Sequence, residues 1–358
     1  MAHSPLVDAA PLWRVASPYF SEATDRWLDD FVPADQHRFE LVSRVGEAVP
    51  WHLKKSPRSS GSEWRDFNQQ ARITMDSPCD GMIGVFPQVT ATLAARARMR
   101  RDDRPIVSWF FNTNLESAAR RLTARVSLSR VDRFVVHSTI EIEAYSRLLK
   151  IPEDRFRFVH LQYGGTIETD APDIDGPYVF ATGSGFRDYG TFFDAMRTLG
   201  YPTLVLAGPR VLAGLDIPDN VTIVDSMSRS EIRRHVRHAR VNVVPMTTDG
   251  LTAGVVTLVE TFRHGRGVVA TRRSGLEDYL IHDQNSLLSS PRNADEMAEC
   301  ISAYWNDELL RNRIDQGATT FAERHCTDQA AAASLVTVLD EVLGSSSAGA
   351  ANQHFEAA

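Results

Sequence analysis

The sequence has few features that would link it to structural metal or to nucleic acid. Among its 358 residues it has three cysteines, Cys79, Cys300 and Cys326, which lie far apart and form no CxxC pair. This usage argues against structural zinc and favours a reducing compartment. The net charge of −7 lacks the basic excess that is typical of nucleic-acid-binding chains, so we expect no nucleic-acid partner.

Long hydrophobic segments are also missing. No stretch reaches the 18 consecutive apolar residues of a typical membrane span, and the first residues show no apolar run behind a basic start. We therefore expect neither a transmembrane segment nor a secretory signal, and we expect a cytoplasmic protein. The last residues, 344–358, are small and polar, and their composition predicts a disordered tail.

The second half of the chain alternates short apolar runs with runs of helical periodicity. Such short, uniformly apolar strands between helices predict a parallel sheet that is covered on both faces. The expected strands lie at 178–182, 203–208, 221–225, 241–245 and 267–271, and the expected helices at 188–199, 228–239, 255–264, 293–305 and 308–323.

The first half reads less regularly but has the same character. Apolar runs predict strands at 38–45, 80–86, 105–111, 133–138 and 155–161, with a helix at 139–149. The chain is longer than one hydrophobic core usually supports, and residues 163–177 are rich in Gly, Asp and Pro, which is typical of a linker. We predict a first domain at 1–168, a second at 169–326, and a C-terminal helix at 327–343 that packs back on the first domain.

Two loops that follow predicted strand ends carry the candidate chemistry, because ligands of parallel sheets bind beyond the carboxyl ends of the strands. The first loop, "GSGFRDYG" at 183–190, contains Gly183, Ser184, Gly185 and Arg187. Its amide groups and its guanidinium would suit a phosphate. The spacing is not GxGxxG, so no dinucleotide fingerprint is met. The alternative is that Arg187 is a solvated surface cation.

The second loop, "TTDGLTAGVV" at 247–256, leads into an apolar helix, so backbone amides at the helix start would face an anion. Glu260 would lie about 9 Å along the helix from Gly254. A carboxylate there can accept hydrogen bonds from both hydroxyls of a ribose, which would supply donors that Glu260 otherwise lacks. The alternative is a half-buried acid paired with Arg263 or Arg187.

Three stretches resemble a known family when they are taken together and in order. They are "YVFATGSGFRDYGTFFDAM", "TAGVVTLVETFRHGRGVVATRRSGLEDYL" and "NSLLSSPRNADEMAECISAYWND". They are similar to the C-terminal half of GT-B glycosyltransferases, in particular the retaining glycosyltransferase family four, also called group 1. The resemblance covers about 176–325. It implies an α/β fold of two Rossmann-like domains facing across a cleft, with the acceptor in the first domain and the nucleotide sugar in the second.

The resemblance also implies residue roles. Arg187 matches the basic residue that meets the donor phosphates, and Glu260 matches the glutamate that binds the ribose. Gly254, Val255 and Val256 match the loop whose amides face the pyrophosphate or the sugar. Arg187 and Glu260 are therefore the expected catalytic residues, and no metal or cofactor other than the donor is expected.

The chain departs from the family pattern at three places. Thr252 stands eight residues before Glu260, where relatives often have a second glutamate, and we count it with the donor-binding residues. Ser184 or Gly185 stands where relatives have a glycine–arginine pair. Residues 112–114, Asn-Thr-Asn, follow the strand after which many relatives have a histidine.

The implied activity is transfer of a sugar from a nucleoside-diphosphate donor to the hydroxyl of a glycan or lipid-linked acceptor, with retention, in the assembly of cell-surface or exopolysaccharide glycans. Two alternatives stay open: a nucleotide-sugar epimerase on the same fold, and a non-catalytic nucleotide-sugar-binding partner. The arginine-rich segments 95–104 and 119–125 are either solvated helix faces or a patch that meets anionic lipid at the inner face of the membrane.

Overall fold

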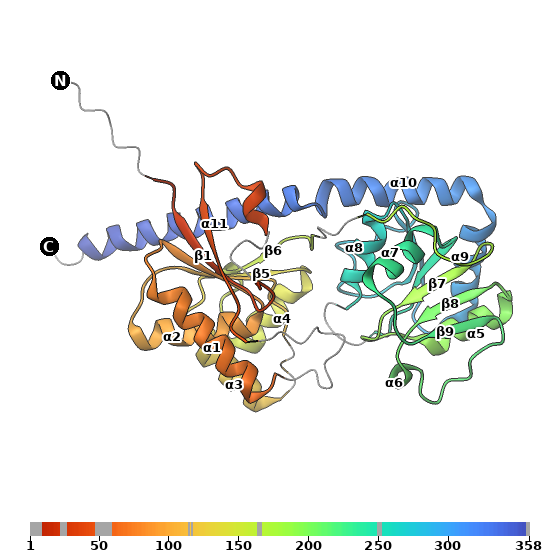
Figure 1. Cartoon of the computed structure of the whole chain (residues 1–358), viewed down its shortest axis with the longest axis horizontal. Coiled ribbons are helices and arrows are strands. Elements are labelled where there is room, and N and C mark those ends of the chain that lie inside the picture. The colour runs from red at the N-terminus through yellow and green to blue at the C-terminus, as the bar shows by residue number, and fades with distance from the viewer. Residues whose placement is uncertain are drawn as a thin grey trace, which may run out of the picture. The chain divides into compact units, whose positions relative to one another are not determined.

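The computed structural model describes residues 9–21, 27–46, 59–113, 115, 117–162, 167–248 and 253–355. The chain divides into two compact units (Figure 1). Unit 1 comprises Met1–Val159 and Ala332–Ala358, and unit 2 comprises His160–Ala331. Each unit contains one six-stranded parallel sheet with flanking helices, which confirms the predicted α/β class with two Rossmann-like domains. The predicted arrangement of the two domains across a cleft stays a prediction.

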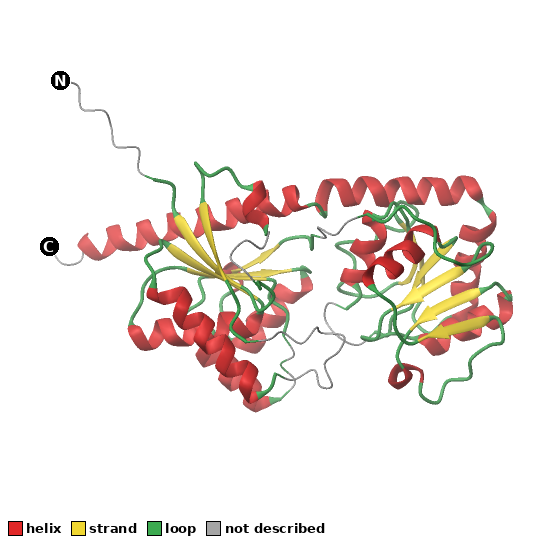
Figure 2. Cartoon of the chain, viewed as in Figure 1, coloured by secondary structure: helices red, strands yellow, loops and turns green. Residues whose placement is uncertain are grey.

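The sheet of unit 1 has the strand order β2-β1-β3-β4-β5-β6. Figure 2 shows its strands in yellow, with helices in red outside them. The strands are β1 (Leu12–Ala16), β2 (Arg38–Val42), β3 (Gly81–Val85), β4 (Ile106–Trp109), β5 (Arg133–Val136) and β6 (Phe156–Phe158). The helices are α1 (Gly61–Asp76), α2 (Pro87–Arg100), α3 (Ala118–Ser127) and α4 (Ile140–Leu149), with the short 3-10 turns η1 (Leu28–Phe31) and η3 (Glu153–Arg155).

The last helix, α11 (Asp328–Phe355), belongs mostly to unit 1. Its apolar residues Leu335, Leu339 and Val342 are buried. The Glu341 carboxylate lies 2.8 Å from Arg157 Nε, which fixes the helix next to β6. The helix continues through residues whose small, polar composition predicted disorder. The alanines of this segment favour helix intrinsically, which composition-based prediction of disorder does not weigh.

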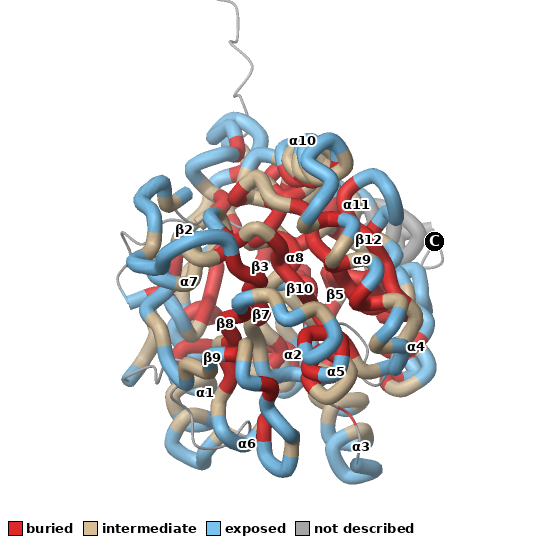
Figure 3. The backbone as a smooth tube through the Cα atoms, turned by 90° about the vertical axis from the view of Figure 1, so that its right-hand side faces the viewer, coloured by how far each residue is buried: buried red, intermediate tan, exposed pale blue. Residues whose placement is uncertain are grey.

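The sheet of unit 2 has the order β12-β11-β10-β7-β8-β9. Its strands are β7 (Val179–Thr182), β8 (Thr203–Leu206), β9 (Val221–Val224), β10 (Val241–Val244), β11 (Val268–Thr271) and β12 (Ser286–Ser289). Its helices are α5 (Tyr189–Leu199), α6 (Pro209–Leu212), α7 (Arg229–His238), α8 (Val255–Arg263), α9 (Ala294–Asn306) and α10 (Glu308–His325). The strands β10, β11 and β12 are buried throughout, and Figure 3 shows exposed positions on the outer turns of the helices.

Strand order fixes where each sheet can hold a ligand. In unit 2 the chain runs outward from β7 through β8 to β9, and then restarts on the other side of β7 with β10. The switch point therefore lies between β7 and β10. In unit 1 the order reverses at β1, which pairs with β2 on one side and with β3 on the other. Open parallel sheets bind ligands outside the carboxyl ends of the strands at such points.

The predicted elements of the second half are observed with ends shifted by a few residues, whereas β12 and α6 were not predicted. In the first half, β1 and α1 were missed, and α2 and α3 were anticipated only as helix faces at 95–104 and 119–125. β1 has a charged residue at its centre, Arg14, which is 5% exposed and whose guanidinium donates to Glu40 and to the carbonyls of Ile73 and Thr74. Residues 163–166 of the predicted linker lie outside the described residues. Among the described helices, none has the length and hydropathy needed to cross a bilayer.

Candidate functional site

Two loops meet at the switch point of unit 2. The loop between β7 and α5 lies against the segment that follows β10. The Asp188 amide donates to the Pro245 carbonyl at 3.1 Å, and the Thr247 amide donates to the Phe186 carbonyl at 2.9 Å. An antiparallel bridge joins Arg187 to Met246 between these two bonds. The backbone thus holds Arg187 directly beyond the carboxyl ends of β7 and β10.

The Arg187 side chain is fixed by contacts from both loops. Its Nε donates to the Thr182 carbonyl at 3.0 Å, and its Nη1 donates to the Gly185 carbonyl at 2.9 Å. Nη1 also lies 2.9 Å from the Met246 Sδ, and Nη2 donates to the Thr257 Oγ1 at 3.0 Å. Thr257 is in the first turn of α8, so Arg187 links the end of β7 to the start of that helix.

The guanidinium of Arg187 carries a charge that its contacts do not neutralise. Every acceptor that Arg187 contacts within the described ranges is uncharged. Burial lowers the pKa of Arg187; Tyr189 opposes this change, and the nearby Arg273 adds to it. Arginine nevertheless stays protonated in proteins, so the site retains a desolvated positive charge. An anion that enters here would offset that cost.

Glycine is required on both sides of Arg187. Gly183 has φ +110°, and a Cβ at this position would overlap the Arg187 guanidinium. Gly254 has φ +93°, and a Cβ there would lie 3.2 Å from the Met246 Sδ and 3.7 Å from Arg187 Nη1. A larger residue at either position would therefore displace the arginine or strain the backbone.

The N-termini of the two neighbouring helices differ. Gly254 is the N-cap of α8, so no side chain caps the first amides of this helix. By contrast, Asp188 caps α5 by accepting from the Thr191 amide at 3.1 Å. Uncapped amides and the helix dipole favour an anion at α8, whereas the Asp188 carboxylate disfavours one at α5. The structure thus favours α8 over the "GSGFRDYG" amides as the place for a phosphate.

The remaining predicted donor-binding residues lie in the β7–α5 loop or at the start of α8, except Thr252. Ser184 and Gly185 are exposed beside Arg187. Val255 is buried, whereas Val256 next to it is 54% exposed. Thr252 lies outside the described residues.

Glu260 lies on α8, about two turns beyond Gly254, and its side chain is 16% exposed. Its Oε1 is 3.6 Å from the Nε of Arg233, which is on α7 and is 13% exposed. The interpretation that Glu260 lacks a protein donor is therefore wrong, and the ion pair is made neither with Arg263 nor with Arg187. A carboxylate offers about four acceptor positions, and the Arg233 contact is made to Oε1.

Sequence reasoning missed Met246, Thr257 and Arg233. Thr257 follows Gly254 by three residues, the spacing of one helical turn, which is a signal that could have been used. Arg233 lies in a helix that was predicted, but the packing of α7 on α8 cannot be read from the sequence.

Other titratable residues of unit 1 have protein partners. His137, which follows β5, is buried, and its Nδ1 lies 2.8 Å from the Val159 carbonyl oxygen; Ser138 beside it is also buried. Asp102 forms an ion pair with Arg104 at 2.6 Å. In the part of the chain that the structure describes, no three His, Cys, Asp or Glu side chains gather as metal ligands would.

Comparisons with known proteins agree with this geometry. Residues 190–307 match the model of the family described as glycosyl transferases group 1. This range contains Gly254 and Glu260 but begins three residues after Arg187. No curated protein matches the chain by sequence.

Solved structures match over nearly the whole chain. Sucrose-phosphate synthase from Thermosynechococcus elongatus aligns with a TM-score of 0.70 at 14% identity, covering 94% of this chain and 100% of its own. A glycosyltransferase from Rickettsia africae aligns with a TM-score of 0.65 at 11% identity, covering 93% of this chain and 99% of its own. HepE from Anabaena, solved with UDP and glucose, aligns with a TM-score of 0.64 at 11% identity, covering 94% of this chain and 100% of its own. At these identities the likeness shows the fold, which is GT-B. Residues 190–307 therefore match the glycosyl transferases group 1, and the chain has the two Rossmann-like domains of the GT-B fold.

Proposed function

We propose that the chain transfers a sugar from a nucleoside-diphosphate sugar to the hydroxyl of a glycan or lipid-linked acceptor, with retention, in the synthesis of cell-surface or exopolysaccharide glycans. One observation carries the donor assignment: a positively charged, mostly buried Arg187 faces neutral acceptors beside the uncapped start of α8. Such a pair of features suits a pyrophosphate. The titles of the HepE structures name UDP, glucose and UDP-glucose as ligands of that protein, which supports the same ligand class here.

In this proposal the pyrophosphate lies at the switch point of unit 2. Arg187 and the first amides of α8, from Val255 onward, stabilise the negative charge that grows on the leaving phosphate as the glycosidic bond breaks. The Thr257 hydroxyl and the Met246 thioether hold the guanidinium in place, so little reorganisation accompanies the reaction. A phosphate oxygen takes the acceptor proton on the face that the phosphate leaves, which gives retention.

In this proposal Glu260 binds the nucleoside part of the donor. Its position about 9 Å along α8 from Gly254 corresponds to the reach from a pyrophosphate to the far edge of a ribose. Arg233 contacts Oε1 of this carboxylate, and in this proposal the carboxylate oxygens also accept hydrogen bonds from the ribose hydroxyls. We include Ser184, Gly185 and Val256 among the residues that line this donor site.

The proposal is tested by a donor assay. Each of several nucleotide sugars is incubated with the protein, with and without an acceptor mixture, and the products are followed by NMR of the anomeric protons. Slow donor hydrolysis without acceptor, and a product that keeps the donor's anomeric configuration, are expected. An epimerised nucleotide sugar would establish the epimerase alternative, and binding without turnover would establish the non-catalytic one.

We place the reaction in the cytoplasm, where nucleotide sugars are made available and where the free thiols of Cys79, Cys300 and Cys326 would persist.

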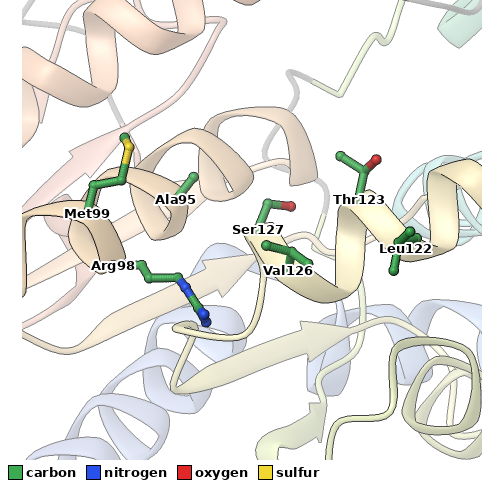
Figure 4. A pocket seen from close by; sticks show the side chains of 7 residues that line it. All are labelled: Ala95, Arg98, Met99, Leu122, Thr123, Val126 and Ser127. Atoms are coloured by element: carbon green, nitrogen blue, oxygen red, sulfur yellow. The ribbon is translucent and has the colours of Figure 1, made fainter.

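We also propose that the groove between α2 and α3 contacts an anionic membrane. Its walls combine apolar side chains with one basic side chain, Arg98, around a cavity of about 630 Å³ (Figure 4). Met99, Leu122 and Val126 are 74%, 63% and 55% exposed. The residues that line the cavity are Ala95, Arg98, Met99, Leu122, Thr123, Val126 and Ser127.

The charge around this groove is smaller than the sequence implied. Arg100 forms an ion pair with Asp76 at 2.7 Å, and Arg104 forms one with Asp102. Arg98 donates instead to the neutral Ser129 hydroxyl, so its charge remains available to a lipid phosphate. Exposed apolar side chains next to such a charge fit a surface that is both anionic and apolar.

Vesicle co-sedimentation tests this contact. Leu122→Ser should weaken binding to anionic vesicles, and high salt should weaken it in the unmodified protein. Leu309, which is 83% exposed on α10, provides the control, because Leu309→Ser should leave binding unchanged. Equal binding to neutral and anionic vesicles would refute the proposed contact with an anionic membrane.

A further inference from the structure

Aromatic side chains follow four neighbouring strands of the unit 1 sheet. Phe86, Phe110 and His137 come directly after β3, β4 and β5, and Tyr19 comes three residues after β1. Because the strands are parallel, all four residues lie at one edge of the sheet. Their ring centroids are 5.0 Å apart for Tyr19 and Phe86, 4.7 Å for Phe86 and Phe110, and 4.8 Å for Phe110 and His137. We call these four residues the aromatic row.

The aromatic row lies where an open sheet binds ligands. The order of the sheet reverses at β1, and Tyr19 and Phe86 follow the two strands that flank this switch point, β1 and β3. Tyr19 is 51% exposed, and Phe86 and Phe110 are partly exposed. A ligand at the switch point would therefore meet aromatic faces.

Two members of the row have strained backbones. Phe86 has φ +77° and Phe110 has φ +62°, a region that bulky residues rarely adopt. Glycine would adopt this conformation without strain, yet phenylalanine occupies both positions. Such strain is found where the surrounding structure holds a residue for a purpose other than stability.

The strained conformation of Phe110 is not needed to fill the hydrophobic core. The next residue, Phe111, is fully buried and packs on Phe134 and Tyr145, each at a centroid distance of 5.0 Å. Phe111 thus supplies the core contact at this strand end. The Phe110 ring turns instead to Phe86 and His137, at the edge of the sheet.

We propose that the aromatic row binds a sugar ring of the acceptor, so that the acceptor is a saccharide at its binding end. This inference rests on the proposed transferase function. One face of a sugar ring consists largely of C–H groups, which pack on the negative face of an aromatic ring, while its hydroxyls stay hydrated. The rings of Tyr19, Phe86 and Phe110 are tilted by 68° and 49° to one another and are partly exposed, so they offer separate faces rather than a closed apolar trough for an alkyl chain.

A substitution series at Phe110 distinguishes a sugar ring from an alkyl chain as the ligand of the aromatic row. Phe110→Tyr keeps an aromatic face, Phe110→Leu keeps apolar bulk alone, and Phe110→Gly removes the ring and relieves the backbone. Binding is measured by saturation-transfer NMR with methyl glucoside, methyl galactoside and maltotriose, and with octanol as the alkyl probe. The saccharide Kd should be retained in the Tyr variant and should rise about tenfold in the Leu and Gly variants. Phe110→Gly should melt no lower than the unmodified protein.

Two controls keep the outcomes distinct. Phe111→Leu should lower the melting temperature and leave saccharide affinity unchanged. Affinity for nucleoside diphosphates is measured on the same samples: its absence in the unmodified protein would overturn the proposed function rather than the aromatic row. The aromatic row as a saccharide site is overturned if none of the saccharides binds, if Phe110→Leu binds saccharide as well as Phe110→Tyr, or if octanol binds in their place.

Discussion

The ion pair between Glu260 and Arg233 separates two roles for the carboxylate. If Glu260 only stabilises the packing of α7 on α8, removing either partner should have the same consequences. If Glu260 binds ribose, removing the carboxylate's charge should cost nucleotide affinity, whereas removing Arg233 should cost mainly stability. The variants Glu260→Gln and Arg233→Gln keep shape and polarity, so they test charge with little change in volume.

The expected magnitudes follow from the burial of the pair. Both side chains are less than one fifth exposed, so either variant leaves a partly buried charge without its partner. We expect each to lower the free energy of unfolding by about 1–3 kcal/mol. Charge-assisted hydrogen bonds contribute about 1.5–3 kcal/mol each, so Glu260→Gln should weaken nucleoside and nucleoside diphosphate alike by roughly tenfold or more. Arg233→Gln should change both affinities by less than about threefold, or about 0.7 kcal/mol, because in this account Arg233 does not itself contact the nucleotide.

The assay has two stages. A thermal-shift screen against UDP, GDP, ADP and TDP identifies the base, since a ligand of the folded state raises the apparent stability. Isothermal titration of that diphosphate and its nucleoside then compares the two variants and the double variant. Unchanged affinity in Glu260→Gln, or an equal loss in Arg233→Gln, would refute the ribose role and leave Glu260 as a structural acid.

Three further predictions follow from the same site. Gly183→Ala should weaken binding of the diphosphate more than binding of the nucleoside, because the added Cβ would displace the Arg187 guanidinium. Titration of both ligands checks this, and an equal loss of affinity for the two ligands would contradict it. Asp188→Ala should cost about 1 kcal/mol of stability by removing the α5 cap, seen as a lower urea midpoint, without lowering diphosphate affinity; a large affinity loss would place the anion at α5 instead. Sugar transfer should survive EDTA, because Arg187 and the α8 amides supply the positive potential at the pyrophosphate; complete loss that magnesium or manganese restores would show that a metal is needed.

The sequence predicted the unit 2 strands well because each is a short, uniformly apolar run between turn residues. It failed where buried strands carry polar residues. β12, "SLLS", is buried at every position, including Ser286 and Ser289. The central Arg14 of β1 hid that strand, since only tertiary contacts with α1 and β2 satisfy its guanidinium. The start of α1 had a usable local signal, the capping box of Ser60 and Glu63.

The site was predictable in part for a related reason. Loops after strand ends, small residues before an apolar helix and a lone acid within that helix are local patterns, so Arg187, Gly254 and Glu260 could be singled out. The contacts that give them their properties are between segments distant in sequence. Met246 and Thr257 hold Arg187 from 59 and 70 residues away, and Arg233 comes from the neighbouring helix. Likewise, the aromatic row depends on the order of strands in the sheet of unit 1, which no single stretch specifies.

The central claim, a pyrophosphate held by Arg187, is tested most directly by comparing a nucleoside diphosphate with its nucleoside. Arg266 provides the matched control, because it is a half-buried arginine of the same unit that precedes β11 and pairs with Asp315 at 2.7 Å. Both ligands are titrated into Arg187→Ala and Arg266→Ala. We predict that Arg187→Ala weakens the diphosphate by roughly tenfold to a hundredfold and the nucleoside by less than about threefold, whereas Arg266→Ala lowers stability without distinguishing the two ligands. An equal effect of Arg187→Ala on both ligands, or none on either, would contradict the account.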